Sequence, residues 1–253
     1  MKKIILLLSA AVVLISCSKV GKDEYIISGT AKGVENGKTI ILERQDESGM
    51  GLVAVDTVKV ENGKFEIKGK ITEPSFYTIQ LEAASAKVPF ILENGEIAIT
   101  IDKDSIQKSK VSGTYSNEEY VKFNDEIKVI QKKLMGFQKD NMQAMTAAQQ
   151  TNDTVVINKL MKEYTKIQEE VGTASKAKYT SYAESHPKSF ITTLIVQGLL
   201  MDPATDVKKM ETIYNGLDET LKNTKPGKAI KAKLTGTKSP SAGAPVPATG
   251  DAK

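Results

Sequence analysis

Few residues of this chain have the type and spacing that a catalytic or metal site requires. His186 is the only histidine, and it could act as a general base or a metal ligand. It stands before Pro187 at the expected end of a helix and has no partner motif, which favours a structural role. The Asp-Lys-Asp segment at 102–104 lacks the ligand number and spacing of a calcium loop, which favours a solvated strand end. We therefore predict no catalytic residue, no cofactor and no metal site, and we expect that the protein is not an enzyme.

Cys17, the only cysteine, has a different chemistry available to it. Lys2 and Lys3 precede an uninterrupted run of apolar and small residues, 4–15, which is too short to span a bilayer and is typical of an export signal. The sequence Leu14-Ile15-Ser16-Cys17 resembles the lipobox of bacterial lipoproteins, whose cysteine is acylated and becomes the new N-terminus. The resemblance implies that residues 1–16 are a lipoprotein signal peptide and that Cys17 is lipidated. An ordinary signal peptide with an incidental cysteine is the alternative.

The residues after Cys17 bear on the membrane that carries the protein. Ser18 replaces the aspartate that, in well-studied envelopes, retains lipoproteins in the inner membrane, so the outer membrane is favoured. Segment 22–24, Lys-Asp-Glu, resembles a signal that sends some Bacteroidota lipoproteins to the cell surface, although a solvated charged linker also explains it. We expect residues 17–24 to form a tether. The predicted location is the cell envelope, on the periplasmic face or the cell surface.

Composition limits the partners and the means of stabilisation. The 253 residues include 35 Lys and Arg against 31 Asp and Glu, a net charge of +4. Removal of residues 1–16 takes away two lysines and leaves +2 (4 − 2), so we predict no nucleic-acid partner. With one cysteine, no internal disulfide can form. Packing alone must stabilise the fold, and the predicted partners are the membrane, through the lipid on Cys17, and an envelope protein.

Residues 25–113 alternate apolar and polar side chains and are rich in Val, Ile and Thr, which predicts about eight short strands. The tripeptide Glu-Asn-Gly occurs three times, at 35–37, 61–63 and 93–95. Asn-Gly suits the two central positions of a type I′ turn, so each pair predicts a hairpin. The segment should form an antiparallel β-sandwich or open barrel.

Residues 114–235 have helical periodicity instead, so the fold class should be α+β. Ser116 and Glu119 fit a capping box at the start of a long helix. Asp153 can cap a second helix, which should end near His186. The apolar stripes on the two helices predict an antiparallel hairpin; they are Tyr120, Phe123, Ile127, Ile130, Leu134 and Phe137, and then Ile157, Leu160, Tyr164, Ile167, Val171 and Ala174.

Shorter helices should follow the hairpin. Segment 189–201 is the most apolar of them, Asp202 with Pro203 should cap the next, and 226–234 can form the last. An acid-free lysine series could contact anionic lipid headgroups, but a solvated helix face is favoured; it comprises Lys222, Lys225, Lys228, Lys231, Lys233 and Lys238. Residues 236–253 have almost no large apolar side chain and should be a disordered tail.

Several segments together resemble a known family, over roughly residues 25–235. They are Asp56-Thr57-Val58-Lys59-Val60, Gly63-Lys64-Phe65, Gly69-Lys70, Glu73-Pro74-Ser75-Phe76-Tyr77, Pro89-Phe90-Ile91-Leu92-Glu93-Asn94-Gly95 and His186-Pro187-Lys188-Ser189-Phe190. The family is the uncharacterised N-terminal domain of Bacteroidota lipoproteins that precedes a thioredoxin-like, thiol-disulfide oxidoreductase domain. The resemblance implies that such a domain should begin near residues 238–245.

The redox site of that domain needs two cysteines, one to attack and one to resolve, and this sequence has no such pair. The family's activity therefore transfers to no residue here. The leading hypothesis is a lipid-anchored envelope protein that acts as a non-catalytic binding or scaffold module. The alternative is an accessory or truncated member of a thiol-disulfide system that works with a separate thioredoxin-like protein. An enzyme whose site no motif reveals is a third option.

Overall fold

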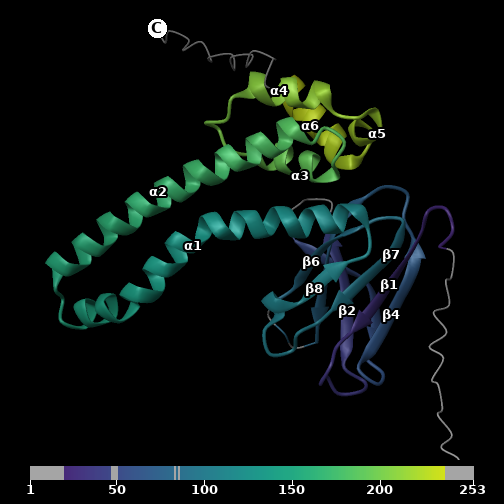
Figure 1. The fold of residues 1–253 in the computed structure, drawn as a ribbon, viewed down its shortest axis with the longest axis horizontal. Helices are drawn as coiled ribbons and strands as arrows, with labels where there is room; N and C mark the ends of the chain where they lie inside the picture. The colour runs from purple at the N-terminus through teal and green to yellow at the C-terminus, as the bar shows by residue number, and fades with distance from the viewer. Residues whose placement is uncertain (1–19, 47–50, 83, 85, 237–253) are drawn as a thin grey trace, which may run out of the picture.

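The computed structural model describes residues 20–46, 51–82, 84 and 86–236. It consists of an N-terminal β-sandwich and a C-terminal helical region (Figure 1), which confirms the predicted α+β class. The predicted signal peptide, Cys17 and almost all of the predicted tail lie outside the described residues. None of the helices in the described part of the chain has the length and apolar character needed to cross a bilayer.

Two four-stranded sheets face each other and share one core, and the described strands do not close into a barrel. One sheet has the order β4-β1-β7-β8 and the other the order β3-β2-β5-β6. All described pairs are antiparallel except β1 with β7, which are parallel. The strands are β1 (Glu24–Thr30), β2 (Thr39–Gln45), β3 (Leu52–Lys59), β4 (Lys64–Lys70), β5 (Ser75–Leu81), β6 (Val88–Leu92), β7 (Gly95–Thr100) and β8 (Lys110–Ser112).

The three Asn-Gly pairs do not form hairpins between paired strands, so that part of the prediction is wrong. Each pair joins strands of different sheets: β1 to β2, β3 to β4, and β6 to β7. Only Asn62 and Gly63 both have positive φ, at 52° and 69°. Turn chemistry fixes only the residues of the turn, whereas the apolar faces of the strands decide which sheet each one joins.

The helical region begins with a hairpin of α1 (Tyr115–Gln150) and α2 (Thr154–Ser185), as predicted. Asp153 accepts hydrogen bonds from the backbone of Val155 and Val156, which confirms it as the cap of α2. The hairpin extends away from the rest of the molecule (Figure 1). Four shorter helices follow: α3 (Phe190–Leu199), α4 (Val207–Gly216), α5 (Glu219–Lys222) and α6 (Lys225–Gly236). Of these, α3 packs against α2, and α6 packs against α3, α4 and α5.

Two helix caps differ from the sequence prediction. Thr114 is the N-cap position of α1, and Ser116 lies inside the helix, where its N–H and hydroxyl both donate to the Glu93 carboxylate (3.0 and 2.7 Å). Asp206 caps α4, whereas Asp202 accepts from Ala204 N–H in the preceding turn. Ser116 forms these long-range hydrogen bonds because the sandwich places the Glu93 carboxylate at the N-terminal, positive end of the α1 dipole.

Asn117 attaches α1 to the sandwich. Its side chain is fully buried, accepts from Ile91 N–H (2.8 Å) and donates to Ile91 C=O (2.7 Å). It thereby occupies the hydrogen-bonding positions that another strand would take at the free edge of β6. The Ile91 side chain belongs to the helical core, whereas Phe90 and Leu92 point into the sandwich. A second link joins Glu73 to Lys225 N–H at the start of α6 (3.1 Å).

Aromatic rings cover two glycines in the β1–β4 pair. Gly29 lies opposite Phe65, and Gly69 opposite Tyr25. A Cβ built on Gly29 would lie 1.9 Å from the Phe65 ring. We expect Gly29→Ala to lower the free energy of unfolding by about 1–3 kcal/mol, because the ring would be forced out of the core. Chemical denaturation measures this.

A matched control for that substitution is Gly136→Ala. Gly136 lies within α1, and a Cβ built there meets no atom within 4 Å. This change should raise the free energy of unfolding by up to about 1 kcal/mol, because alanine restricts the unfolded chain and favours helix. Equal destabilisation by the two variants would contradict the packing role of Phe65.

Candidate functional site

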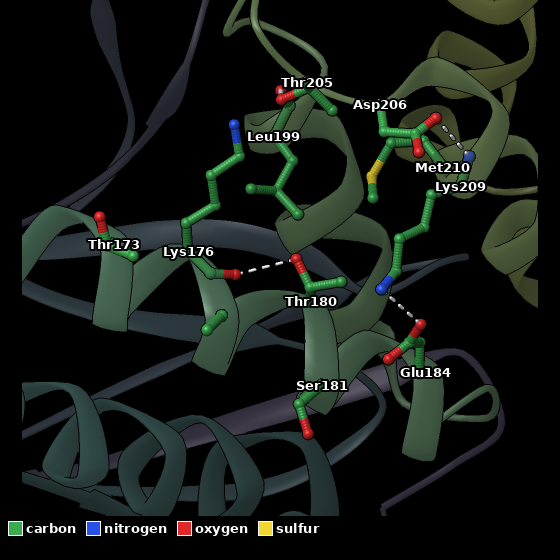
Figure 2. A pocket seen from close by; sticks show the side chains of 11 residues that line it. Thr173, Lys176, Thr180, Ser181, Glu184, Leu199, Thr205, Asp206, Lys209 and Met210 are labelled. Atoms are coloured by element: carbon green, nitrogen blue, oxygen red, sulfur yellow. Dashed lines mark hydrogen bonds and ion pairs between the residues drawn. The ribbon is translucent and has the colours of Figure 1, made fainter.

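A cavity of about 440 Å³ lies between the C-terminal half of α2 and the start of α4 (Figure 2). Helical periodicity places its α2 residues on one face. Most of its lining side chains are polar or charged, whereas Leu199 and Met210 are large and apolar. The complete lining is Thr173, Lys176, Ala177, Thr180, Ser181, Glu184, Leu199, Thr205, Asp206, Lys209 and Met210.

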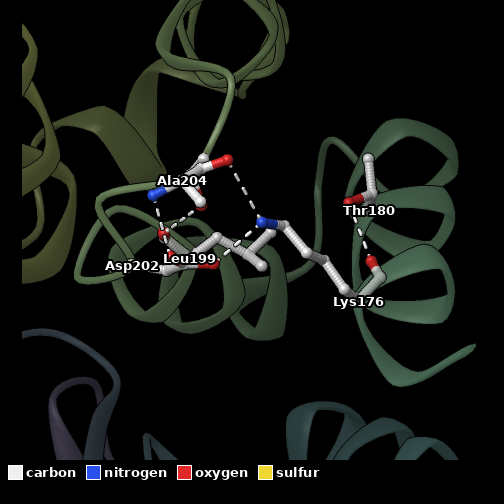
Figure 3. A network of polar contacts seen from close by, with 6 residues as sticks. Lys176, Thr180, Leu199, Asp202 and Ala204 are labelled. Atoms are coloured by element: carbon white, nitrogen blue, oxygen red, sulfur yellow. Dashed lines mark hydrogen bonds and ion pairs between the residues drawn. The ribbon is translucent and has the colours of Figure 1, made fainter. Parts of the chain in front are cut away.

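The two amines of this cavity are each paired with a carboxylate. Lys209 contacts Glu184 at 2.9 Å, and Lys176 contacts Asp202 at 2.8 Å. Figure 3 shows that Lys176 Nζ also reaches Ala204 C=O (3.4 Å). Hydrogen bonding from Lys176, followed by that from the Ala204 backbone, lowers the pKa of Asp202. Both lysines of the cavity are thus held by contacts within the protein.

A smaller cleft of about 160 Å³ lies between α1 and the end of α2, and it brings His186 among charged residues. The His186 ring stacks on Tyr182, with centroids 4.0 Å apart and planes at 5°. Its Nδ1 lies 3.0 Å from Tyr182 C=O and 2.8 Å from Ser185 Oγ. Lys178 pairs with Glu126 across the cleft at 2.5 Å. These contacts give His186 a definite packing role at the end of α2.

Glu119 is the most constrained acid of this cleft. Its Oε1 accepts from Tyr115 OH (2.8 Å), and its Oε2 is buried without a hydrogen-bond partner among the described residues. Burial raises the pKa of Tyr182 to about 12; the bond to Ser189 opposes this rise, and the Glu119 carboxylate adds to it. The cleft therefore holds a phenol that stays neutral at physiological pH beside a carboxylate.

Sequence reasoning did not anticipate either cleft. The ion pair of Lys176 with Asp202 spans 26 residues, and that of Lys178 with Glu126 spans 52 (178 − 126). No local motif records such pairs. Of the residues of these two clefts, the sequence singled out His186 as a possible functional residue. Its position at the end of α2 places it in the smaller cleft.

The other residues that the sequence suggested as possible ligand contacts, the 102–104 segment and the lysine series, form local contacts or are exposed. Asp102 Oδ1 accepts from the N–H groups of Asp104 and Ser105 (3.1 and 2.8 Å), which closes a loop after β7. Within the described ranges, no three His, Cys, Asp or Glu side chains are arranged to hold a metal ion. Lys222 pairs with Glu219 and donates to Asn215 C=O. Four other lysines of the series are exposed, and Lys238 lies outside the described residues; the exposed ones are Lys225, Lys228, Lys231 and Lys233.

A third recess of about 380 Å³ lies in the distal half of the hairpin, where only two helices pack together. Methionines form much of its wall, and Met142 and Met161 are 64% and 49% exposed. Gln138 reaches across it to Tyr164 OH (3.4 Å). Met142 and Met145 are visible in the sequence as the large apolar residues of a polar segment, but their position beside α2 is not.

Residues 25–120 match the family described as a domain of unknown function (DUF4369). The matched segment comprises the β-sandwich and the first residues of α1, and it ends just after Asn117. Within this segment lie most of the motifs on which the sequence resemblance rests. No curated protein matches the chain.

Proposed function

We propose that this protein is a lipid-anchored module of the cell envelope that binds a partner without catalysing a reaction. The lipid on Cys17 would hold it at the outer membrane, and the distal half of the helical hairpin would be the binding surface. The observation that carries the proposal is the methionine-walled recess at the far end of the hairpin. Two of its large apolar side chains, Met142 and Met161, are exposed, as is typical of an interaction surface.

The position of the recess supports this role. The purple start of the described chain, which leads into β1, and the α1–α2 turn lie toward opposite ends of the molecule (Figure 1). The body would thus present the hairpin far from its point of attachment. Methionine suits such a surface because its flexible, polarisable side chain adapts to different partners.

Partner capture from cross-linked envelopes tests the proposal. The full chain should enrich a specific protein, and Met142→Lys should reduce that enrichment about tenfold, because an ammonium group must then be desolvated in the interface. Gln143→Lys, at the neighbouring exposed position, is the matched control and should leave enrichment unchanged. Recovery of the same abundant proteins with all three chains would contradict the proposal.

A second candidate function rests on the sequence resemblance. Residues 25–235 resemble the region that precedes thioredoxin-like oxidoreductase domains, and the matched domain of unknown function, residues 25–120, lies within them. The protein would then be an accessory or truncated member of a thiol-disulfide system that docks with a separate thioredoxin-like protein. Neighbouring reading frames distinguish the two functions. A frame that opens a thioredoxin-like domain with a Cys-x-x-Cys pair would favour the second candidate.

A further inference from the structure

One flank of the helical hairpin has no charged side chain over most of its length. In α1, every third or fourth residue between 131 and 149 is neutral, and the same holds in α2 between 154 and 175. These residues, which we call the neutral flank, are Gln131, Met135, Gln138, Met142, Met145 and Gln149 in α1 and Thr154, Asn158, Met161, Thr165, Gln168, Gly172 and Ser175 in α2. Lysine, arginine, aspartate and glutamate make up 26% of the chain, so this neutrality is a specific property of the flank.

The two neutral series face the same side of the hairpin. Gln138, Met142 and Met145 from α1 line one recess together with Met161 from α2. The opposite flank is charged, and there Lys133 forms an ion pair with Glu170 across the two helices. It also includes Asp140, Lys159, Glu163 and Lys166. The hairpin is therefore charged on one side and neutral on the other.

The spacing of the neutral flank is that of a helix-packing surface. Residues at alternating intervals of three and four form a continuous seam along a helix. The apolar stripe of α1 that packs against α2 uses this spacing, and the neutral flank repeats it beside that stripe. Among the described residues, no element covers the flank, since Met135 is 61% exposed and Met142 is 64% exposed.

We propose that the neutral flank binds the same flank of a second copy of this chain, so that two hairpins form a four-helix bundle. This inference rests on the proposed function only in taking the hairpin as the binding surface. A surface without charged side chains can pack on its own copy without the cost of taking charges out of water, which the charged flank would have to meet. Two packed helices supply half of a four-helix bundle.

The size of the flank is sufficient for this pairing. The α1 series covers 18 residue-to-residue steps (149 − 131), or about 27 Å along the helix. Two adjacent helices are roughly 20 Å wide, so each copy offers about 500 Å² and the pair buries about 1,000 Å², the threshold for a specific interface and the size of a weak, reversible one.

Disulfide cross-linking in the envelope tests the pairing, because an acylated Cys17 leaves the chain without a free thiol. Gln138 and Met142 lie near the middle of the neutral flank, where an antiparallel pair brings equivalent residues together. We expect Gln138→Cys or Met142→Cys to give about tenfold more covalent dimer than Gln143→Cys, because a disulfide needs Cα atoms within about 7 Å. Gln143 is also exposed but lies about 100° further around the helix than Met142.

A second measurement does not depend on thiols. The mass of the full chain in detergent should rise with concentration from monomer to dimer. The double variant Gln138→Lys with Met142→Lys should weaken that association about tenfold or more, through like charges placed opposite each other. Its thermal unfolding should stay close to that of the unchanged chain, because both positions are exposed.

Three results would overturn the inference: a monomer at all concentrations, equal cross-linking at Gln143→Cys, or cross-linking of the flank to a different protein. The last result would leave the proposed binding function intact and replace only the partner. A covalent dimer of the unchanged chain would instead contradict the anchor at Cys17, and the mass measurement would then decide the pairing alone.

Discussion

Replacement of Asn117 by alanine should lower the free energy of unfolding by roughly 3 kcal/mol, because two buried backbone groups of Ile91 would lose their partners. Each unsatisfied buried group costs about 1–3 kcal/mol, and the lost side chain also leaves a cavity. For a body of this size, the melting temperature should fall by roughly 6–12 °C. Thermal and denaturant unfolding of the purified chain measure the effect.

The matched control for this substitution is Asn158→Ala. Asn158 is exposed in α2, and its change should alter stability by no more than about 0.5 kcal/mol. Asn117→Asp is informative as well, because it keeps the acceptor for Ile91 N–H but removes the donor to Ile91 C=O. If Asn117→Ala proves as mild as Asn158→Ala, then α1 is not held to β6 through these bonds.

The second large effect concerns location. Exchange of residues 1–17 for an ordinary cleavable export signal should move the protein from the membrane fraction to the soluble fraction. The physical reason is that two or three acyl chains on Cys17 would provide the attachment, at about 0.8 kcal/mol for each buried CH₂ group. Among the helices of the described chain none can replace them by crossing the bilayer. Fractionation followed by immunodetection measures the change.

A matched exchange of residues 1–13 alone keeps the sequence from Leu14 to Cys17 and should leave the protein on the membrane. The two exchanged chains differ only in the segment that resembles a lipobox. If both remain on the membrane, attachment depends on the body of the protein. If both become soluble, the segment around Cys17 is not sufficient for lipidation.

Local sequence patterns predicted most elements of the fold. Alternation predicted the strands, the apolar stripes predicted the α1–α2 hairpin, and Asp153 predicted the start of α2. The prediction that Ser116 is the N-cap of α1 was wrong. Glu93, 23 residues earlier in the chain, approaches the same helix end from the sandwich and binds the Ser116 hydroxyl instead. The parallel pairing of β1 with β7 was also hidden, since it joins segments about 70 residues apart. Long-range partners of this kind leave no trace in a short window.

The candidate sites show the same division. The clefts depend on ion pairs between distant residues, such as Lys176 with Asp202, so their geometry could not be predicted. The neutral flank differs from the clefts in this respect. The spacing of its residues can be read from the sequence once the register of the two helices is known. Met142 and Met145 are its most visible members. The sequence does not reveal that the methionines of α1 and α2 line one recess.

Mass spectrometry of the mature protein from its own membrane tests the central claim most directly. The account predicts that the first residue is Cys17 and that the chain is heavier than residues 17–253 by the mass of its glyceryl and acyl groups. A mature chain with an unmodified thiol at Cys17, or one that begins at another residue, would contradict it.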